Sequence, residues 1–393
     1  AQTGARSAVP ESAPAASRLR SRLAQLRPER VHAMPATGCD SMTAAILAER
    51  LGGESIADGV IRICRDIPLD STLGSIDLAT VHPTPKLPGE IRTHQLRQVY
   101  IDTETTGRSG GSGPLAFLLG VAVFKDACMV LTQFLLTRFA AEGMLLHSFA
   151  GTLTPHDRLV SYNGKSYDLP LLLTRFRMQL LQQPFAGLPH LDLLHPVRRL
   201  FGHRWENCRL QSLEQNLLGF ARVDDLPGSE APAAWFDYVR SGYGERLIRV
   251  VEHNRQDIVS LAVAHRVLAR AIEQPRAFDV DLFALARWLA EHDETAAREL
   301  LQAHVSSLDA DGLRLLGRYC RRAGDWLHAV AIWEKLAATG CTESLERLAK
   351  YHEHISKDLA AARRCCERLP QGAEYDQRRR RIDRKMFSKQ IKL

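Results

Sequence analysis

From about residue 98 the chain alternates between short apolar runs and amphipathic segments, the pattern of a mixed α/β domain. Three apolar runs of strand length come first. A helical segment over 140–153 follows, then an apolar strand at 158–163 and an amphipathic helix that begins near Tyr167. A further short strand and a long periodic helix over 244–272 complete the domain. This order predicts a mixed sheet flanked by helices.

The residues before this domain are less regular. Residues 1–30 are rich in Ala, Ser, Pro and Arg, which favours a disordered leader. Residues 31–95 predict a small N-terminal segment with a strand at 60–64 and a proline-rich linker. We therefore expect the α/β domain to occupy residues 96–274.

The part of the chain beyond Pro275 predicts helices alone. Three segments repeat a leucine-led theme, with a period close to the 34 residues of tetratricopeptide-type helix pairs; they begin at Leu285, Leu316 and Leu348. We expect degenerate tetratricopeptide-like repeats over 275–372, followed by a basic tail over 373–393.

The composition of the 393-residue chain is that of a globular protein, with 45% hydrophobic and 25% charged residues. Its net charge of +7 mildly favours a polyanionic partner. Eight cysteines without a CxxC pair indicate reduced thiols in a cytoplasmic protein rather than disulfides or a zinc site. The longest apolar run, 114–124, is shorter than the roughly 20 residues that a membrane helix needs, so we expect no membrane partner.

Two acids lie one residue apart on the first predicted strand, in the sequence VYIDTET. Strand alternation places Asp102 and Glu104 on one face, with Thr103 on the opposite face. Two like charges held this close raise each other's pKa unless a cation neutralises them. Carboxylate oxygens suit Mg²⁺ or Mn²⁺. An Asp-x-Glu pair alone is weak evidence, because a solvated edge strand explains it equally well.

Two later segments carry further acids. Asp168 follows SYNGKSY, where a strand ends and a helix begins, and taken alone it is better explained as a first-turn or capping residue. His253 and Asp257 lie four residues apart on one helical face. In isolation, a surface acid paired with a histidine explains that spacing slightly better than a catalytic site.

Taken together and in this order, the three elements resemble the DEDD exonuclease superfamily of the ribonuclease H-like fold. Six segments over about residues 92–271 are similar to the YprB-type ribonuclease H-like domain. They are DTETTGxxGGxGxLAFLLG, LVSYNGKSYDLPLLLTRF, HLDLLHPVRRL, CRLQSLEQNLLGF, DDLPGSEAPAAWFDYVRSG and EHNRQDIVSLA. This resemblance implies an α/β ribonuclease H-like domain, with a mixed central sheet flanked by helices. Adding the repeats, we expect a C-terminal all-α helical-repeat domain after it.

The resemblance also implies a metal-dependent 3′–5′ exonuclease that hydrolyses phosphodiester bonds at a single-stranded 3′ end of DNA or RNA. Two Mg²⁺ or Mn²⁺ ions would be held by four ligands; one ion would activate a water and the other would stabilise the leaving 3′ oxygen. The implied ligands are Asp102, Glu104, Asp168 and Asp257. His253 is the implied base, although the histidine-bearing branch usually places its histidine five residues before the last Asp, and the four-residue spacing belongs to the tyrosine-bearing branch.

Several polar residues near these motifs are candidates for substrate binding: Thr105, Asn163, Tyr167, Asp192, Arg198 and Arg199. Each of the last five has an ordinary alternative: a turn for Asn163, packing for Tyr167, a cap or turn for Asp192, and solvation for the arginines. Arg204 and the run Arg378–Arg381 are further candidate phosphate contacts, with a disordered basic end as the alternative for the run. Residues 107–113, GRSGGSG, lack the GK[ST] ending of a phosphate loop and predict a hairpin turn.

Two other functions stay open at this level. The fold could serve as a nucleic-acid-binding scaffold with weak or absent catalysis, whose repeats recruit a protein partner, or as an endonuclease. The presence of all four acids favours the exonuclease. Metal binding at the four acids and the pattern of cleavage products distinguish the three functions.

Overall fold

The computed structural model describes residues 41–70, 72–73, 76–77, 86–90, 96–107, 113–126 and 128–390. The fold described below belongs to the unit Met42–Leu393. The predicted leader at 1–30 lies outside the described residues, as do residues 108–112 of the predicted glycine-rich turn.

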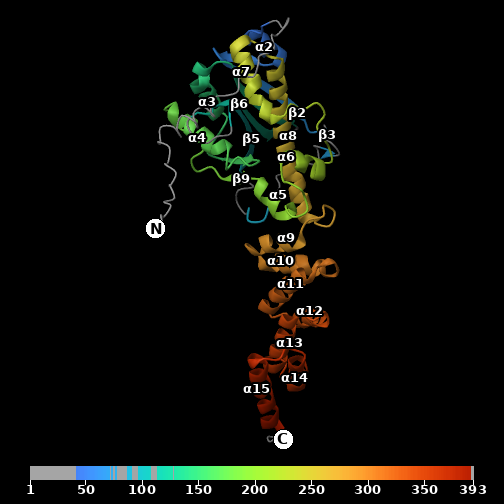
Figure 1. Cartoon of the computed structure of the whole chain (residues 1–393). Coiled ribbons are helices and arrows are strands. Elements are labelled where there is room, and N and C mark those ends of the chain that lie inside the picture. Colours follow the sequence, from blue (N-terminus) through green and yellow to red (C-terminus); the bar gives the residue numbers. More distant parts are fainter. Residues whose placement is uncertain are drawn as a thin grey trace, which may run out of the picture. The chain divides into compact units, whose positions relative to one another are not determined.

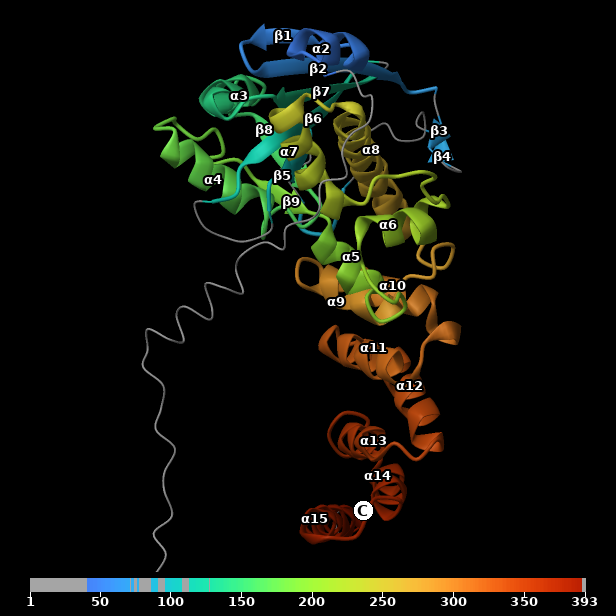
Figure 2. The same cartoon turned by 45° about the horizontal axis from the view of Figure 1, so that its top comes forward.

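A seven-stranded mixed sheet forms the centre of the α/β domain (Figures 1 and 2), in the order β1-β2-β7-β6-β5-β8-β9. The pairs from β1 to β5 are antiparallel, and β5–β8 and β8–β9 are parallel. This confirms the predicted mixed sheet. Its strands are β1 (Glu54–Ala57), β2 (Val60–Pro68), β5 (Arg97–Thr105), β6 (Ala116–Lys125), β7 (Cys128–Leu136), β8 (Asp157–Ser161) and β9 (His190–Asp192), while β3 (Thr72–Leu73) and β4 (Ile76–Asp77) form a separate pair.

Strand β5 lies inside the sheet, and its apolar residues are buried on both faces. Val99 and Ile101 belong to one hydrophobic core, and Tyr100 belongs to the other. Full burial of one such side chain stabilises a fold by about 1.5–3 kcal/mol. Both faces therefore hold β5 in one register, which fixes the position of the polar residues at its end.

Helices cover both faces of the sheet. Residues of α3 (Glu142–Ala150), α4 (Asp168–Met178) and α7 (Ala231–Ser241) enter the core that contains Val99, and α2 (Ala44–Leu51) joins them. On the other face, α5 (Leu194–Phe201), α6 (Leu210–Leu213), the single π-helical turn η4 (Glu214–Leu218) and the second half of α8 (Glu245–Glu273) surround Tyr100. Helix α8 packs against β5, β6 and β7 (Figure 2). Short 3₁₀ turns η3 (Phe139–Ala141) and η5 (Gly228–Glu230) precede α3 and α7.

The N-terminal strands extend the same sheet. The sequence predicted a strand at 60–64 in a separate small segment, but β2 continues to Pro68 and pairs with β7 along its whole length. Its apolar residues Val60, Ile61 and Ile63 are buried in the shared core. This pairing satisfies the backbone groups that β7 would otherwise expose at an edge.

Between residues 282 and 390 the chain is helical, which confirms the prediction of an all-α C-terminal region. Successive helices pack as neighbours, α9 with α10, α11 with α12 and α13 with α14. Five of them begin after an Asp whose carboxylate accepts backbone N–H bonds, the capping arrangement that favours a helix start. The helices are α9 (Leu282–Ala290), α10 (Glu294–Ala303), α11 (Ala310–Arg322), α12 (Trp326–Ala338), α13 (Thr342–His354), α14 (Leu359–Glu367) and α15 (Ala373–Gln390), with the 3₁₀ turn η6 (Val305–Ser307) before α11.

The predicted basic tail is a helix over 373–390, so a disordered end is wrong for these residues. Arg381 binds both carboxylate oxygens of Glu353 at 2.7 Å, and Lys385 binds the same carboxylate at 2.7 Å. These bonds lower the pKa of the fully buried Glu353 to about 2. None of the helices in the described part of the chain is both long and apolar enough to span a membrane.

Candidate active site

Four carboxylates from three elements gather near the C-terminal end of β5. Asp102 and Glu104 come from β5, Asp168 is the first residue of α4, and Asp257 lies on α8. Burial, together with the negative charge of the other three, raises the pKa of Asp102 well above its ordinary value. Burial and the charges of Asp257 and Asp168 do the same to Glu104. Burial raises the pKa of Asp168 to about 6, although a hydrogen bond from Thr103 acts in the opposite direction.

Asp102 and Asp168 have neutral hydrogen-bond partners. Asn254 Nδ2 donates to Asp102 Oδ2 at 2.8 Å, and the Thr103 hydroxyl donates to Asp168 Oδ1. Thr103 was predicted on the opposite face from Asp102. It still takes part in the site because α4 packs on that face and brings Asp168 to the end of the strand. Both acids line a cleft of about 540 Å³. We call Asp102 and Asp168 the open half of the cluster.

A buried amide chain orients Asp102. Asp102, Gly120 and Gln133 are register partners on β5, β6 and β7. Gln133 Nε2 donates to Asn254 Oδ1 at 2.8 Å, which leaves the Asn254 amide nitrogen to donate to Asp102. A side chain at Gly120 would place its Cβ 2.4 Å from Asn254 Oδ1 and 2.2 Å from Ile258 Cδ1. Glycine at this position therefore lets α8 approach the sheet closely enough for Asn254 to reach Asp102.

Glu104, His253 and Asp257 form the other side of the cluster. One ligand atom from each lies within 4.8 Å of the other two. His253 Nε2 is 3.9 Å from Glu104 Oε1 and 3.6 Å from Asp257 Oδ2. The other ring nitrogen, Nδ1, lies 2.6 Å from Asp225 Oδ1. We call Glu104, His253 and Asp257 the clamped half, because charged residues behind it hold two of its members.

Arg222 supplies the positive charge behind the clamped half. Its Nε and Nη2 donate to the two oxygens of Glu214 at 2.7 and 2.6 Å. The guanidinium also donates to Asp257 Oδ1, and its Nη1 lies 3.2 Å from Asp225 Oδ2. The bonds from His253 and Arg222 hold the pKa of Asp225 below its ordinary value, although its partial burial acts in the opposite direction. Only 7% of the Arg222 side chain and 1% of the Glu214 side chain are exposed.

The turn that leads into α4 is fixed by Asp192. Its carboxylate accepts the backbone N–H of Asn163 at 2.7 Å and that of Lys165 at 3.0 Å. Asn163 has a φ of +66°, so the left-handed residue of this turn is Asn163 rather than Gly164. Gly164 is required for a different reason, since its Cβ would lie 2.5 Å from Ser161 Oγ. Asp192 thus acts on the backbone that presents Asp168.

The substrate-binding candidates differ in where they lie. Thr105, Asn163 and Tyr167 line the same cleft as Asp102 and Asp168, and Tyr167 is 57% exposed. Asp192 is buried behind the turn. Arg198 is exposed on α5 and has no ion pair within the ranges that the structure describes.

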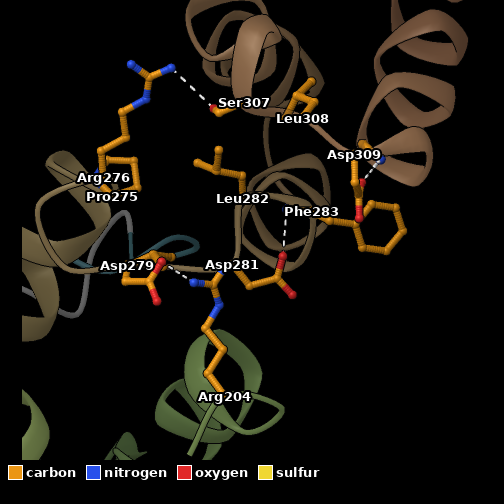
Figure 3. A pocket seen from close by; sticks show the side chains of 12 residues that line it. Arg204, Pro275, Arg276, Asp279, Asp281, Leu282, Phe283, Ser307, Leu308 and Asp309 are labelled. Carbon is orange, nitrogen blue, oxygen red and sulfur yellow. Dashed lines mark hydrogen bonds and ion pairs between the residues drawn. The ribbon is translucent and has the colours of Figure 1, made fainter.

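Arg199 and Arg204 have protein partners. Arg199 pairs with Glu291 at 3.0 Å and lies 5.4 Å from the ring centre of Trp288. Arg204 pairs with Asp279 at a second hollow of about 330 Å³, where Arg276 also lies and Ser307 accepts a bond from it (Figure 3). These contacts join α5 and the residues after it to the segment around α9. Both arginines therefore stabilise the packing of these segments.

The donor set of the cluster fits a hard divalent cation. All four acids offer carboxylate oxygens, the ligands that Mg²⁺ and Mn²⁺ prefer. The Arg222 guanidinium donates to one of them, Asp257, and makes two further bonds to Glu214. The raised pKa values of Asp102, Glu104 and Asp168 have the same cause, namely buried negative charge without a matching positive charge.

Sequence reasoning missed five residues of this site: Gln133, Glu214, Arg222, Asp225 and Asn254. Asn254 and Asp225 lie inside the segments EHNRQD and DDLPG that carry the family resemblance, so their position in those segments could have marked them. Gln133 offered the weaker clue of a polar residue within an apolar strand. Glu214 lies in CRLQSLEQNLLGF, another segment that carries the resemblance. Arg222 offered no clue, since an Arg after a predicted helix is usually solvated.

A family model and a curated relative show the family of this chain, and a solved structure shows a more distant similarity. A family model described as the RNase_H superfamily matches residues 99–268. The uncharacterized protein YprB of Bacillus subtilis (strain 168) is 33% identical over 283 residues, which cover 68% of this chain and 68% of that protein. The family B DNA polymerase from the hyperthermophilic archaeon Pyrobaculum calidifontis is 13% identical, with a TM-score of 0.37, and the match covers 62% of this chain. This chain spans about a third (34%) of the length of that polymerase.

Proposed function

Because this chain belongs to the family of the Bacillus subtilis protein YprB and carries an RNase_H superfamily domain, we propose that it is a metal-dependent nuclease, acting as a 3′–5′ exonuclease on DNA or RNA. The observation that carries the proposal is the convergence of Asp102, Glu104, Asp168 and Asp257 beside an open cleft. Buried acids with raised pKa values are costly to a fold, and they occur where a cation or a reaction uses them.

The proposed roles follow from the position of each side chain. Asp102, Glu104, Asp168 and Asp257 would hold two Mg²⁺ or Mn²⁺ ions. Bound there, the ions would supply activation of a water and stabilisation of the charge on the leaving oxygen. His253 Nε2 faces Glu104 and Asp257 and is the proposed acceptor of the proton of the attacking water. The water oxygen forms a bond to phosphorus, the bond from phosphorus to the 3′ oxygen breaks, and that oxygen leaves with a proton from solvent.

The cleft beside the open half supports a single-stranded end as the substrate. It is lined by the exposed ring of Tyr167 and by the polar side chains of Thr105 and Asn163. Stacking of a base on an aromatic ring contributes about 1–3 kcal/mol and requires that the base be unpaired. We therefore assign the terminal nucleotide to this cleft, with Tyr167 against its base.

The helical region supports a further classification as tetratricopeptide-like repeats. The pairs α11–α12 and α13–α14 pack as neighbours, as in a helix-turn-helix array. The predictions of a protein partner for this region and of a cytoplasmic location rest on the sequence alone.

The test is a cleavage assay with purified full-length protein. A 5′-labelled single strand and a duplex with a 3′ overhang, each as DNA and as RNA, are incubated with Mn²⁺, Mg²⁺ or EDTA. We expect a metal-dependent ladder that shortens from the 3′ end, and a loss of about 10³-fold or more in Asp102→Ala. Asp66→Ala, an exposed acid on β2, is the matched control and should keep full activity.

Two other results would overturn the exonuclease. Internal cuts that Asp102→Ala abolishes would make the protein an endonuclease of the same fold. Absence of cleavage under every condition, with salt-sensitive binding that survives Asp102→Ala, would favour the nucleic-acid-binding scaffold.

A further inference from the structure

We propose that Glu214, Arg222 and Asp225 form a positioning clamp that fixes Asp257 and holds His253 in the tautomer whose Nε2 is free to accept a proton. The catalytic consequence rests on the proposed nuclease function. The tautomer itself is a property of the metal-free protein and can be measured without any substrate.

Glu214 anchors Arg222. The two form a parallel pair of bonds, 2.7 and 2.6 Å long, and both side chains are almost fully buried. Such two-point pairing fixes the plane of a guanidinium as well as its place. Glu214 belongs to the π-helical turn η4, which packs against α8. Arg222 is therefore held by a rigid element, and its approach to Asp257 is a consequence of that anchoring.

Arg222 in turn orients Asp257. Its Nη2 donates to Asp257 Oδ1, while Asp257 Oδ2 points to the cluster and lies 3.6 Å from His253 Nε2. One oxygen of Asp257 is thus committed to the protein and the other is presented to the site. The groups behind an ion's ligands commonly have this task of holding a ligand in one orientation.

Asp225 decides the tautomer of His253. Its Oδ1 lies 2.6 Å from His253 Nδ1, and a carboxylate can only accept a hydrogen bond, so Nδ1 must carry the proton. Arg222 Nη1 is also near Nδ1, but at 3.4 Å, and two donors cannot share one bond. The contact with Asp225 is the shorter one, so we assign the hydrogen bond of His253 Nδ1 to Asp225. Neutral His253 then has an unprotonated Nε2 directed at Glu104 and Asp257.

Arg222 also joins the two arms of the clamp. Its Nη1 reaches Asp225 Oδ2 at 3.2 Å while its Nη2 reaches Asp257. The planar guanidinium sets the spacing between the acid that orients His253 and the acid that faces it. We infer that loss of Asp225 frees the imidazole to rotate or to move its proton to Nε2, without moving Asp102 or Asp168, which have other partners.

The first experiment measures the tautomer. Full-length metal-free protein carrying ring-¹⁵N histidine is studied by NMR, and His253 is identified by the signal that is lost in His253→Gln. We expect a protonated Nδ1 and an unprotonated Nε2 in the wild type. In Asp225→Asn, whose amide N–H can donate to Nδ1, the proton should move to Nε2. Asp224→Asn, an exposed neighbour, is the matched control and should leave the signals unchanged.

The second experiment measures function. In Asp225→Asn we expect kcat to fall about 10–100-fold with KM within about twofold, and in Arg222→Lys we expect Mn²⁺ alone, titrated by calorimetry, to bind about tenfold more weakly. Thermal unfolding followed by circular dichroism checks that each variant is folded, and Asp225→Ser provides a second variant.

The inference is overturned if wild-type His253 carries its proton on Nε2, or if Asp225→Asn and Asp225→Ser leave both the tautomer and kcat at the level of Asp224→Asn. A wild type that cleaves no nucleic acid but shows the Nδ1–H tautomer, lost in Asp225→Asn, would refute the nuclease and leave the clamp standing. The two proposals therefore fail separately.

Discussion

The two halves of the carboxylate cluster differ in how their charge is balanced. In the open half, Asp102 and Asp168 receive hydrogen bonds from an amide and a hydroxyl, and both face the cleft. In the clamped half, Asp257 pairs with a buried guanidinium, and His253 pairs with Asp225 behind it. The carboxylates of the open half present their negative charge to the cleft. In the clamped half, Asp257 and His253 are oriented by the charged residues Arg222 and Asp225.

This difference separates two tasks within one site. Neutral donors orient Asp102 and Asp168 but leave their negative charge uncompensated. An incoming cation can therefore compensate that charge. The clamp orients His253 and Asp257, whose directions matter for accepting a proton and for presenting one oxygen. Changes on the two sides should therefore have opposite effects on the stability of the metal-free protein.

The largest effect is expected from the clamp. Arg222→Met leaves Glu214, Asp225 and Asp257 without their shared cation, and breaking a buried ion pair from one side costs about 3–5 kcal/mol. We expect the free energy of unfolding in urea, with EDTA present, to fall by that amount. Arg249→Met, an exposed arginine on α8 that donates only to a backbone carbonyl, should change it by less than about 0.5 kcal/mol.

The free energy of unfolding of an open-half variant, measured in the same way, tests the difference between the two halves. Asp102→Asn removes one of the mutually repelling charges and keeps an oxygen that can accept from Asn254. The metal-free variant should be at least as stable as the wild type. If Asp102→Asn and Arg222→Met both destabilise the protein by several kcal/mol, the distinction between the two halves is wrong.

A smaller effect is expected at the cleft. Tyr167→Ala removes the exposed ring and should weaken binding of a single strand by about 1–3 kcal/mol, measured by fluorescence anisotropy in Ca²⁺, which holds carboxylate sites without supporting rapid cleavage. Tyr167→Phe keeps the stacking surface and is the control. Equal binding by Tyr167→Ala and Tyr167→Phe would place the terminal base elsewhere.

Much of the fold could be predicted because each segment carries its own pattern. The apolar runs of β5, β6 and β7 and the long periodic helix α8 appear where the sequence placed them. The joining of β2 to β7 could not be predicted, since strand pairing between residues 60 or more positions apart depends on which edge is left open. The helical nature of 373–390 was missed because its many arginines resemble a tail, and its stabilising partner, Glu353, is distant in sequence.

The site divides in the same way. Asp102, Glu104, Asp168, His253 and Asp257 were candidates because their types and order resemble the DEDD superfamily, although each element taken alone has an ordinary explanation. The structure brings their side chains close together. Arg222, Glu214 and Asp225 were missed because their importance comes from three-dimensional proximity to Asp257 and His253. Thr103 lies on the face that strand alternation predicts, and its role depends on α4, which packs on that face and brings Asp168 to it.

The smallest expected effect is a dependence of the free energy of unfolding on pH, which comes from Asp168 in the open half. The pKa of Asp168 is about 6 in the folded protein and 3.8 ordinarily, so between these values the folded state binds more protons than the unfolded state. Its contribution to stability is greatest below pH 3.8 and is lost as the pH rises through about 6. Between pH 5 and pH 7 the metal-free protein should lose about 1 kcal/mol through this group. Asp225, whose folded pKa is lowered from 3.8, has its full contribution throughout this range.

Urea unfolding in EDTA at pH 5, 6 and 7 tests this by comparing the wild type with Asp168→Asn. Taking the difference between the two proteins removes the opposing contribution of the half-buried His190 and the buried His265, whose lowered pKa values make the fold more stable as the pH rises. The wild type should lose stability relative to Asp168→Asn as the pH increases, and Mg²⁺ at pH 7 should restore it, since a cation then compensates the ionised carboxylate. Parallel curves for the two proteins would mean that the charge of Asp168 is already compensated within the protein, as that of Asp257 is by Arg222.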